Sequence, residues 1–96
     1  MKYKVFKSGP RKGEPRTKQD RIVRFLLARG MHETLKRYSS RRVFEKDLDG
    51  DIATYYVGKN GSVRVGGTYS DSISVTKFFH HMMMLWEKRE GLWREE

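Results

Sequence analysis

The residues of this sequence best suited to chemistry are its lysines and arginines, which number 21 against 12 aspartates and glutamates. The formal net charge at pH 7 is +9, and the pI is about 10.0. A surplus of this size attracts phosphate-rich or acidic partners over long range, and binding to nucleic acid gains further from counterion release. The sequence therefore predicts an anionic partner, with nucleic acid (DNA or RNA) as the first choice and an acidic protein as the second.

The basic surplus is concentrated at the beginning of the chain. Residues 1–24 contain nine bases and two acids, whereas residues 76–96 contain four of each. Residues 7–16 hold both prolines and two glycines but no large apolar side chain, which is typical of an extended segment. We predict a flexible basic arm over residues 1–16, one α+β domain over residues 17–91 and a short tail over residues 92–96. The bases expected to contact phosphate here are Lys2, Lys4, Lys7, Arg11, Lys12, Arg16, Lys18, Arg21 and Arg24.

A second candidate surface comes from a predicted hairpin. Residues 52–58 are rich in β-branched and aromatic side chains, and Asn60-Gly61 before the return strand at residues 62–67 is a strong signal for a two-residue turn. That turn would pair Tyr56 with Val65 and Val57 with Arg64. The predicted core face is then Thr54, Tyr56, Val63 and Val65, and the predicted open face is Tyr55, Val57, Lys59, Ser62 and Arg64.

This open face combines an aromatic ring with bases, as in surfaces that bind single-stranded nucleic acid by stacking and phosphate contacts. Tyr55, Lys59 and Arg64 are the residues expected to bind, and Arg41 and Arg42 on the preceding strand would enlarge the positive surface. The alternative is an ordinary half-exposed hairpin in which Tyr55 only covers the sheet.

Other clusters of chemically active residues give weaker patterns. Asp47, Asp49 and Asp51 lack the glutamate that closes a calcium loop, and the adjacent pair His80-His81 lacks the spacing of a helical zinc site. We therefore predict no metal and no cofactor. Phosphodiester-cleaving residue types occur without a recognisable arrangement, so a non-catalytic protein is the prediction and a small nuclease the least favoured alternative. These residues are His32, Glu33, Glu45, Lys46 and Asp47.

Composition excludes several classes of protein. The chain has no cysteine, which rules out disulfides and thiolate metal sites. No apolar run is long enough to span a membrane, and the basic start lacks the apolar segment of a signal peptide. A cytoplasmic location without membrane contact is the expectation.

The helices and strands that position these residues can be predicted from helix-capping residues and from the periodicity of apolar side chains. Thr17 with Asp20 three residues later begins a helix that Gly30 ends, and residues 31–40 fit either a short helix or a strand. Residues 41–46 read as a strand and residues 47–51 as a turn. The predicted fold is an N-terminal basic arm, a helix, an antiparallel meander of three or four strands, and a C-terminal helix packed on one face of the sheet.

The C-terminal helix is expected to begin at a cap on Ser74 or Thr76 and to end at Gly91. Its apolar side chains cover a broad arc, which suits core packing with a share left for a homodimer interface. These side chains are Phe78, Phe79, Met82, Met83, Leu85 and Trp86. The alternative function is accordingly a protein-interaction module, such as a small inhibitor or assembly factor, that uses this helix or the basic face.

The element order is similar to that of double-stranded-RNA-binding domains, although only Lys77 stands where those domains have a basic cluster. It is also similar to winged-helix domains. That resemblance implies that residues 31–40 form a recognition helix, with Lys36, Arg37 and Arg41 near the groove. Both likenesses concern topology and identify no family.

Overall fold

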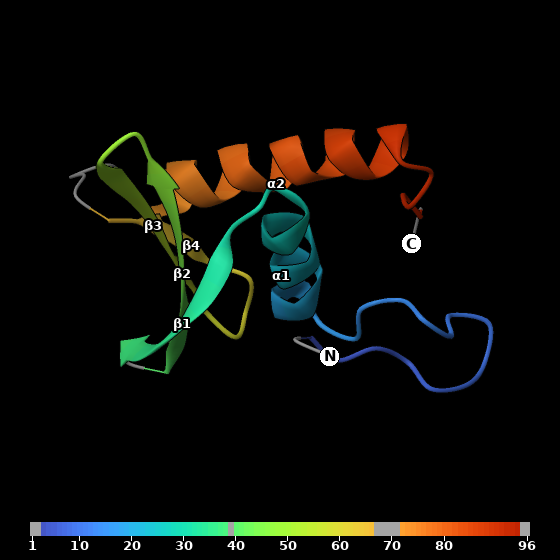
Figure 1. Ribbon diagram of the computed structural model, residues 1–96. Coiled ribbons are helices and arrows are strands. Elements are labelled where there is room, and N and C mark those ends of the chain that lie inside the picture. Colours follow the sequence, from blue (N-terminus) through green and yellow to red (C-terminus); the bar gives the residue numbers. More distant parts are fainter. Residues whose placement is uncertain (1–2, 39, 67–71, 95–96) are drawn as a thin grey trace.

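The computed structural model describes residues 3–38, 40–66 and 72–94, and its elements have the predicted α+β order. Within this part of the chain an antiparallel sheet of four strands has the order β1-β2-β3-β4, and two helices flank it (Figure 1). The elements are α1 (Lys18–Ala28), β1 (His32–Tyr38), β2 (Arg41–Leu48), β3 (Asp51–Val57), β4 (Val63–Val65) and α2 (Ser72–Arg89).

One hydrophobic core lies between the helices and one face of the sheet. Phe44 of β2, Val57 of β3 and Val63 of β4 are fully buried there. The first helix contributes Ile22, Val23, Phe25 and Leu26, and the second contributes Phe79 and Met83. In Figure 1, α2 runs from the sheet to beyond α1, so that it covers both. The C-terminal helix therefore packs on the sheet as the apolar pattern predicted.

Within the segment 31–40, residues 32–38 form the strand β1, not the recognition helix that a winged-helix domain requires. Met31 packs into the core, and β1 pairs with β2 through His32–Glu45 and Tyr38–Arg41, with an irregularity between Glu33 and Arg37. Met31, Leu35 and Tyr38 are spaced like a helical stripe, but Leu35 is fully exposed. The backbone pairing with β2 determines the conformation here, and the likeness to winged-helix domains is wrong.

A tight hairpin turn lies between β2 and β3. Leu48 pairs directly with Asp51, and the two residues between them both have positive φ, 50° at Asp49 and 95° at Gly50. Such a turn matches the twist of the strands on either side, which is why Asp-Gly sequences favour it. The turn predicted over residues 47–51 is confirmed. It is shorter than expected, because β2 continues to Leu48 and β3 already begins at Asp51.

The predicted register of β3 and β4 is wrong by one residue. Gly58 to Ser62 form a longer loop closed by a hydrogen bond from the Gly58 N–H to the Ser62 carbonyl (2.9 Å), and the Asn60 side chain accepts from the Ser62 N–H (3.1 Å). The observed pairs are Tyr55–Val65, Tyr56–Arg64 and Val57–Val63. The return strand is β4 alone, and residue 67 of its expected range lies outside the described residues.

This slip reverses the two faces of β3, because successive side chains of a strand point to opposite sides. Tyr55 and Val57 turn toward the helices, and the Tyr55 ring lies 5.5 Å from the Phe79 ring, centroid to centroid. Tyr56 pairs with Arg64 on the other side of the sheet. The prediction that Tyr55 stands on the open face is therefore wrong. Burial of Val57 and Tyr55 against the helices favours the observed register.

The cap of α1 is confirmed. The Thr17 hydroxyl oxygen accepts from the Asp20 N–H (3.1 Å), and the hydroxyl donates to the Asp20 carboxylate (2.7 Å). Gly30, with φ of 82°, follows the end of the helix as expected. The start of α2 at Ser72 is earlier than either predicted cap. Thr76 instead lies within α2, where its hydroxyl bonds both the N–H (2.9 Å) and the carbonyl (3.2 Å) of Val63.

The basic N-terminal segment forms a loop that returns to the start of α1, drawn in blue in Figure 1. The Phe6 N–H donates to the Glu14 carbonyl (2.9 Å) and the Arg16 N–H to the Lys4 carbonyl (3.1 Å). The Lys4 N–H in turn donates to the Asp20 carboxylate (3.0 Å), which ties the base of the loop to α1. These bonds give the loop a defined path, while its flexibility stays a prediction.

Candidate nucleic-acid interface

Seven of the thirteen bases predicted to bind are exposed and form no ion pair within the part of the chain that the structure describes. Lys2 lies outside this part. Most of the exposed set belongs to the N-terminal loop and the first turn of α1, and Lys59 comes from the β3–β4 loop. The set is Lys4, Lys7, Lys12, Arg16, Lys18, Lys59 and Arg64.

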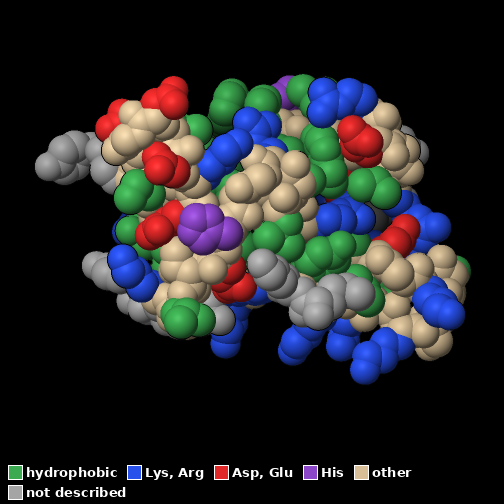
Figure 2. All heavy atoms as spheres, viewed as in Figure 1, with side chains coloured by type: hydrophobic (Ala, Val, Ile, Leu, Met, Phe, Trp, Pro, Cys, Tyr) green, Lys and Arg blue, Asp and Glu red, His purple; other side chains and the backbone are tan. Residues whose placement is uncertain are grey.

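The exposed acids lie elsewhere. Among the described residues these are Asp47, Asp49 and Asp51 at the β2–β3 turn, and Glu90 after α2. In Figure 2 several acidic side chains gather at the upper left, where the β2–β3 turn lies, and a row of basic side chains projects along the lower edge, while other charged side chains of both signs lie between these two groups and at the right. Four of the other described acids, Glu14, Asp20, Glu33 and Glu87, accept hydrogen bonds inside the molecule, and Glu45 is half-buried in β2.

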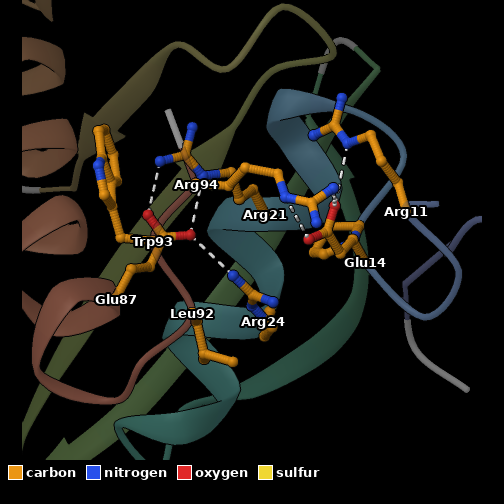
Figure 3. Close-up of a pocket in the computed structure, with 9 residues that line it drawn as sticks. Arg11, Glu14, Arg21, Arg24, Glu87, Leu92, Trp93 and Arg94 are labelled. Carbon is orange, nitrogen blue, oxygen red and sulfur yellow. Dashed lines mark hydrogen bonds and ion pairs between the residues drawn. The ribbon is translucent and has the colours of Figure 1, made fainter. Parts of the chain in front are cut away.

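Arg21 and Arg24 are not presented to solvent as the sequence predicted. Both bind the carboxylate of Glu87, which is only 2% exposed. Arg21 forms two hydrogen bonds with it (2.8 and 2.6 Å) and Arg24 forms one (2.7 Å). Figure 3 shows Glu87 held between the two guanidinium groups. These arginines join α1 to α2, because a buried carboxylate requires paired donors.

A second carboxylate, Glu14, holds two further arginines beside this cluster (Figure 3). Arg11 Nε lies 2.9 Å and Arg94 Nε 3.3 Å from the Glu14 oxygens. The two clusters border a cleft of about 190 Å³, with Leu92 and Trp93 on its wall. Arg11 is thus engaged within the N-terminal loop.

The two arginines of β2 are also partly buried. Arg42 makes a bidentate pair with Glu33 of β1 (2.7 and 2.6 Å), and this hydrogen bonding raises the pKa of Arg42 against the opposing effect of burial. Arg41 has one buried guanidinium nitrogen, Nη1, without a hydrogen-bond partner among the described residues. Neither arginine joins Tyr55 on a common open surface.

Lys4 and Lys59 border one hollow of about 410 Å³ at the start of α1. Tyr3, Thr17, Gln19, Asp20 and Arg42 complete its lining. The Gln19 side chain donates to the Val57 carbonyl (3.1 Å), which fixes the end of β3 against α1. The structure therefore brings together an aromatic side chain, Tyr3, and two bases that are 55 residues apart in sequence. Sequence reasoning missed Tyr3, which had no signal beyond its aromatic type next to two lysines.

The five residues that suggested a nuclease all lie in β1 and β2. His32 and Glu45 are direct partners across these strands, and Glu33 is the partner of Arg42. The Lys46 ammonium donates to the Arg29 carbonyl (2.9 Å), and Asp47 accepts from the Gly50 N–H (3.1 Å). Residues 3–38, 40–66 and 72–94 contain no group of three or more histidine or acidic side chains placed to hold a metal ion.

Comparisons with known protein families, with curated proteins and with solved structures gave no match to this chain. Within the described residues, neither helix has the length and apolar content needed to cross a bilayer.

Proposed function

We propose that this protein binds nucleic acid without catalysis, through contacts to the phosphate backbone. The binding residues are Lys4, Lys7, Lys12, Arg16, Lys18 and Lys59, called the basic surface below. The observation that supports this function is the separation of exposed charge. The exposed acids of the described chain lie at the β2–β3 turn and at Glu90, and the bases of the basic surface have no acid paired with them.

The basic surface gives a quantitative expectation for salt dependence. Each neutralised phosphate releases condensed counterions, so the slope of log affinity against log salt is close to −0.7 per contact on single strands and −0.9 on duplex DNA. With all six bases in contact, the slope is about −4 on a single strand and about −5 on a duplex. Arg21 and Arg24 add little, because Glu87 already holds their guanidinium groups.

The test is fluorescence anisotropy with labelled oligonucleotides of about 20 nucleotides, titrated between about 50 and 300 mM salt. The double variant Lys4→Ala/Lys59→Ala removes two bases of the basic surface, so we expect its slope to be shallower by about 1.4 on single strands. Lys36→Ala/Lys77→Ala is the matched control, since it removes two exposed lysines from β1 and α2.

We expect the slope of the control variant to differ from the wild-type slope by less than about half of the change that one lost phosphate contact causes. Affinity that does not change with salt would contradict the proposed function. Equal losses in the two double variants would show that net charge acts without a defined surface.

A second candidate function is protein interaction through α2, including self-association. Phe78 and Leu85 stand two helical turns apart on α2 and are 66% and 48% exposed. Sedimentation analysis over a range of protein concentrations tests this candidate. Association that Phe78→Ser abolishes, and that Leu35→Ser on β1 preserves, would support it. A monomer at all concentrations would exclude the homodimer and leave a heterologous partner, such as an acidic protein, to be sought by co-purification.

A further inference from the structure

A second hollow lies between the first turns of α1 and the middle of α2, next to the basic surface. Its volume is about 270 Å³, just below the range for pockets that hold drug-sized molecules. No aspartate or glutamate of the described chain lines it. The lining residues are Lys18, Arg21, His80, His81, Met83, Met84 and Trp93.

The β3–β4 loop fixes the polar side of this hollow. His80 Nε2 lies 2.8 Å from the Gly61 carbonyl oxygen, so this nitrogen carries the proton and donates it. Gly61 has φ of 86°, and a Cβ at this position would stand 2.9 Å from Lys18 Cβ and 3.7 Å from His80 Nε2. The glycine thus allows the loop to lie directly against Lys18 and His80. The Lys18 and His81 side chains are exposed at the rim.

The other wall of the hollow is apolar and firmly held. Met83 is buried in the core, Met84 is half-buried, and Trp93 follows the turn at the end of α2. The Trp93 N–H donates to the Glu87 carbonyl (3.1 Å). The Arg21 guanidinium, anchored on Glu87, lies 5.5 Å from the Trp93 ring centroid. The indole is therefore positioned before any ligand arrives.

We propose that this hollow receives one unpaired nucleotide of a single strand. The base would lie against Met84 and Trp93, and its phosphate would lie near Lys18 and His81. This inference rests on the proposed function and adds a substrate class to it. Bases in a duplex are stacked and paired, so they do not enter a hollow of this kind without being unstacked, whereas bases of a single strand are available. The hollow therefore favours single strands over duplexes.

The position of Lys18 indicates how a nucleic-acid strand could run from one hollow to the other. Thr17 and Gln19, its neighbours at the start of α1, line the hollow between Lys4 and Lys59. Lys18 itself lines the hollow proposed for the nucleotide. A backbone that contacts Lys59 and then Lys18 passes from one hollow to the other across the β3–β4 loop.

The experiment uses fluorescence of Trp93 in the full chain. The sequence has two tryptophans, so Trp86→Phe leaves Trp93 as the only one. The probes are an oligothymidylate of about eight nucleotides and an abasic oligomer with the same number of phosphates. We expect the oligothymidylate to quench Trp93 and to bind at least about fivefold more tightly, since stacking of bases on aromatic side chains contributes at this level. The affinity ratio is also measured in the wild-type protein, which does not depend on the substitution.

Met84→Ala tests the apolar wall, with Met82→Ala, a half-buried methionine outside the hollow, as its control. We expect Met84→Ala to lower affinity for oligothymidylate about threefold to tenfold, because an apolar contact to the base is lost, and to leave the abasic oligomer unaffected. Equal binding of the two probes without quenching would overturn the nucleotide site and leave phosphate binding in place. Absence of binding to both probes would overturn the proposed function as well.

Discussion

Glu87 is the residue whose replacement tests the packing of this protein most directly. Its carboxylate is 2% exposed and accepts three hydrogen bonds, two from Arg21 and one from Arg24. Glu87→Gln keeps the shape of the side chain but removes the charge, and it turns an amide donor toward guanidinium donors. The variant therefore leaves two partly buried cations without their counter-charge.

The structure sets the size of the expected effect. Removing one partner of a buried ion pair lowers the free energy of unfolding by about 3–5 kcal/mol. The Arg21 and Arg24 side chains are 33% and 15% exposed, so solvent relieves part of this cost, and we expect about 2–3 kcal/mol. A domain of this size unfolds with roughly 5–14 kcal/mol. The corresponding fall in Tm is roughly 10–20 °C.

Urea unfolding followed by circular dichroism measures this loss of unfolding free energy. Glu90→Gln is the matched control, because the Glu90 side chain is 50% exposed and its ion pair in the described chain is with the exposed Arg89, at 3.7 Å. Such a surface pair contributes about 0–1 kcal/mol. If Glu87→Gln came within about 1 kcal/mol of Glu90→Gln, the view that Glu87 joins α1 to α2 would be refuted.

Two further substitutions test the β3–β4 loop and the register. Gly61→Ala and Gly50→Ala both place alanine at positive φ, a strain of about 1–2 kcal/mol, but only at Gly61 would the new Cβ meet another side chain, 2.9 Å from Lys18 Cβ. We expect Gly61→Ala to cost at least about 1 kcal/mol more in urea unfolding, and equal costs would contradict this loop conformation. Tyr55→Ala removes the ring that packs on Phe79 and should cost about 2–3 kcal/mol. The affinity of this variant for nucleic acid, measured at a temperature well below its Tm, should equal that of the wild type. A loss of affinity would indicate that Tyr55 contacts nucleic acid after all.

Local features of the sequence predict the elements well because each depends on neighbouring residues. The Thr17 cap, the Asp20 carboxylate and the Gly30 stop lie in or directly beside the helix that they delimit, and all three are found in place. The α+β class and the packing of the last helix follow in the same way from periodicity.

The register of β3 and β4 illustrates what local sequence leaves open. Asn60-Gly61 is compatible with a two-residue turn, but the chain forms a five-residue loop from Gly58 to Ser62. The two alternatives differ in which face of β3 is buried, so the choice is made by side chains of α1, α2 and β2. A two-residue turn is found at Asp49-Gly50, between β2 and β3.

The sequence by itself determined the net positive charge of the protein and that most of this surplus lies in the first quarter of the chain. Only the tertiary structure decided which of those bases stay exposed. Arg21 and Arg24 bind the carboxylate of Glu87, more than 60 residues away in sequence, and are thereby withdrawn from the exposed surface. Lys59 and Lys4, by contrast, border the same hollow. The physical reason is that the periodicity of a helix or strand determines which side chains share a face of that element. Which other element packs against this face, and so which side chains become buried or paired, depends on the tertiary structure.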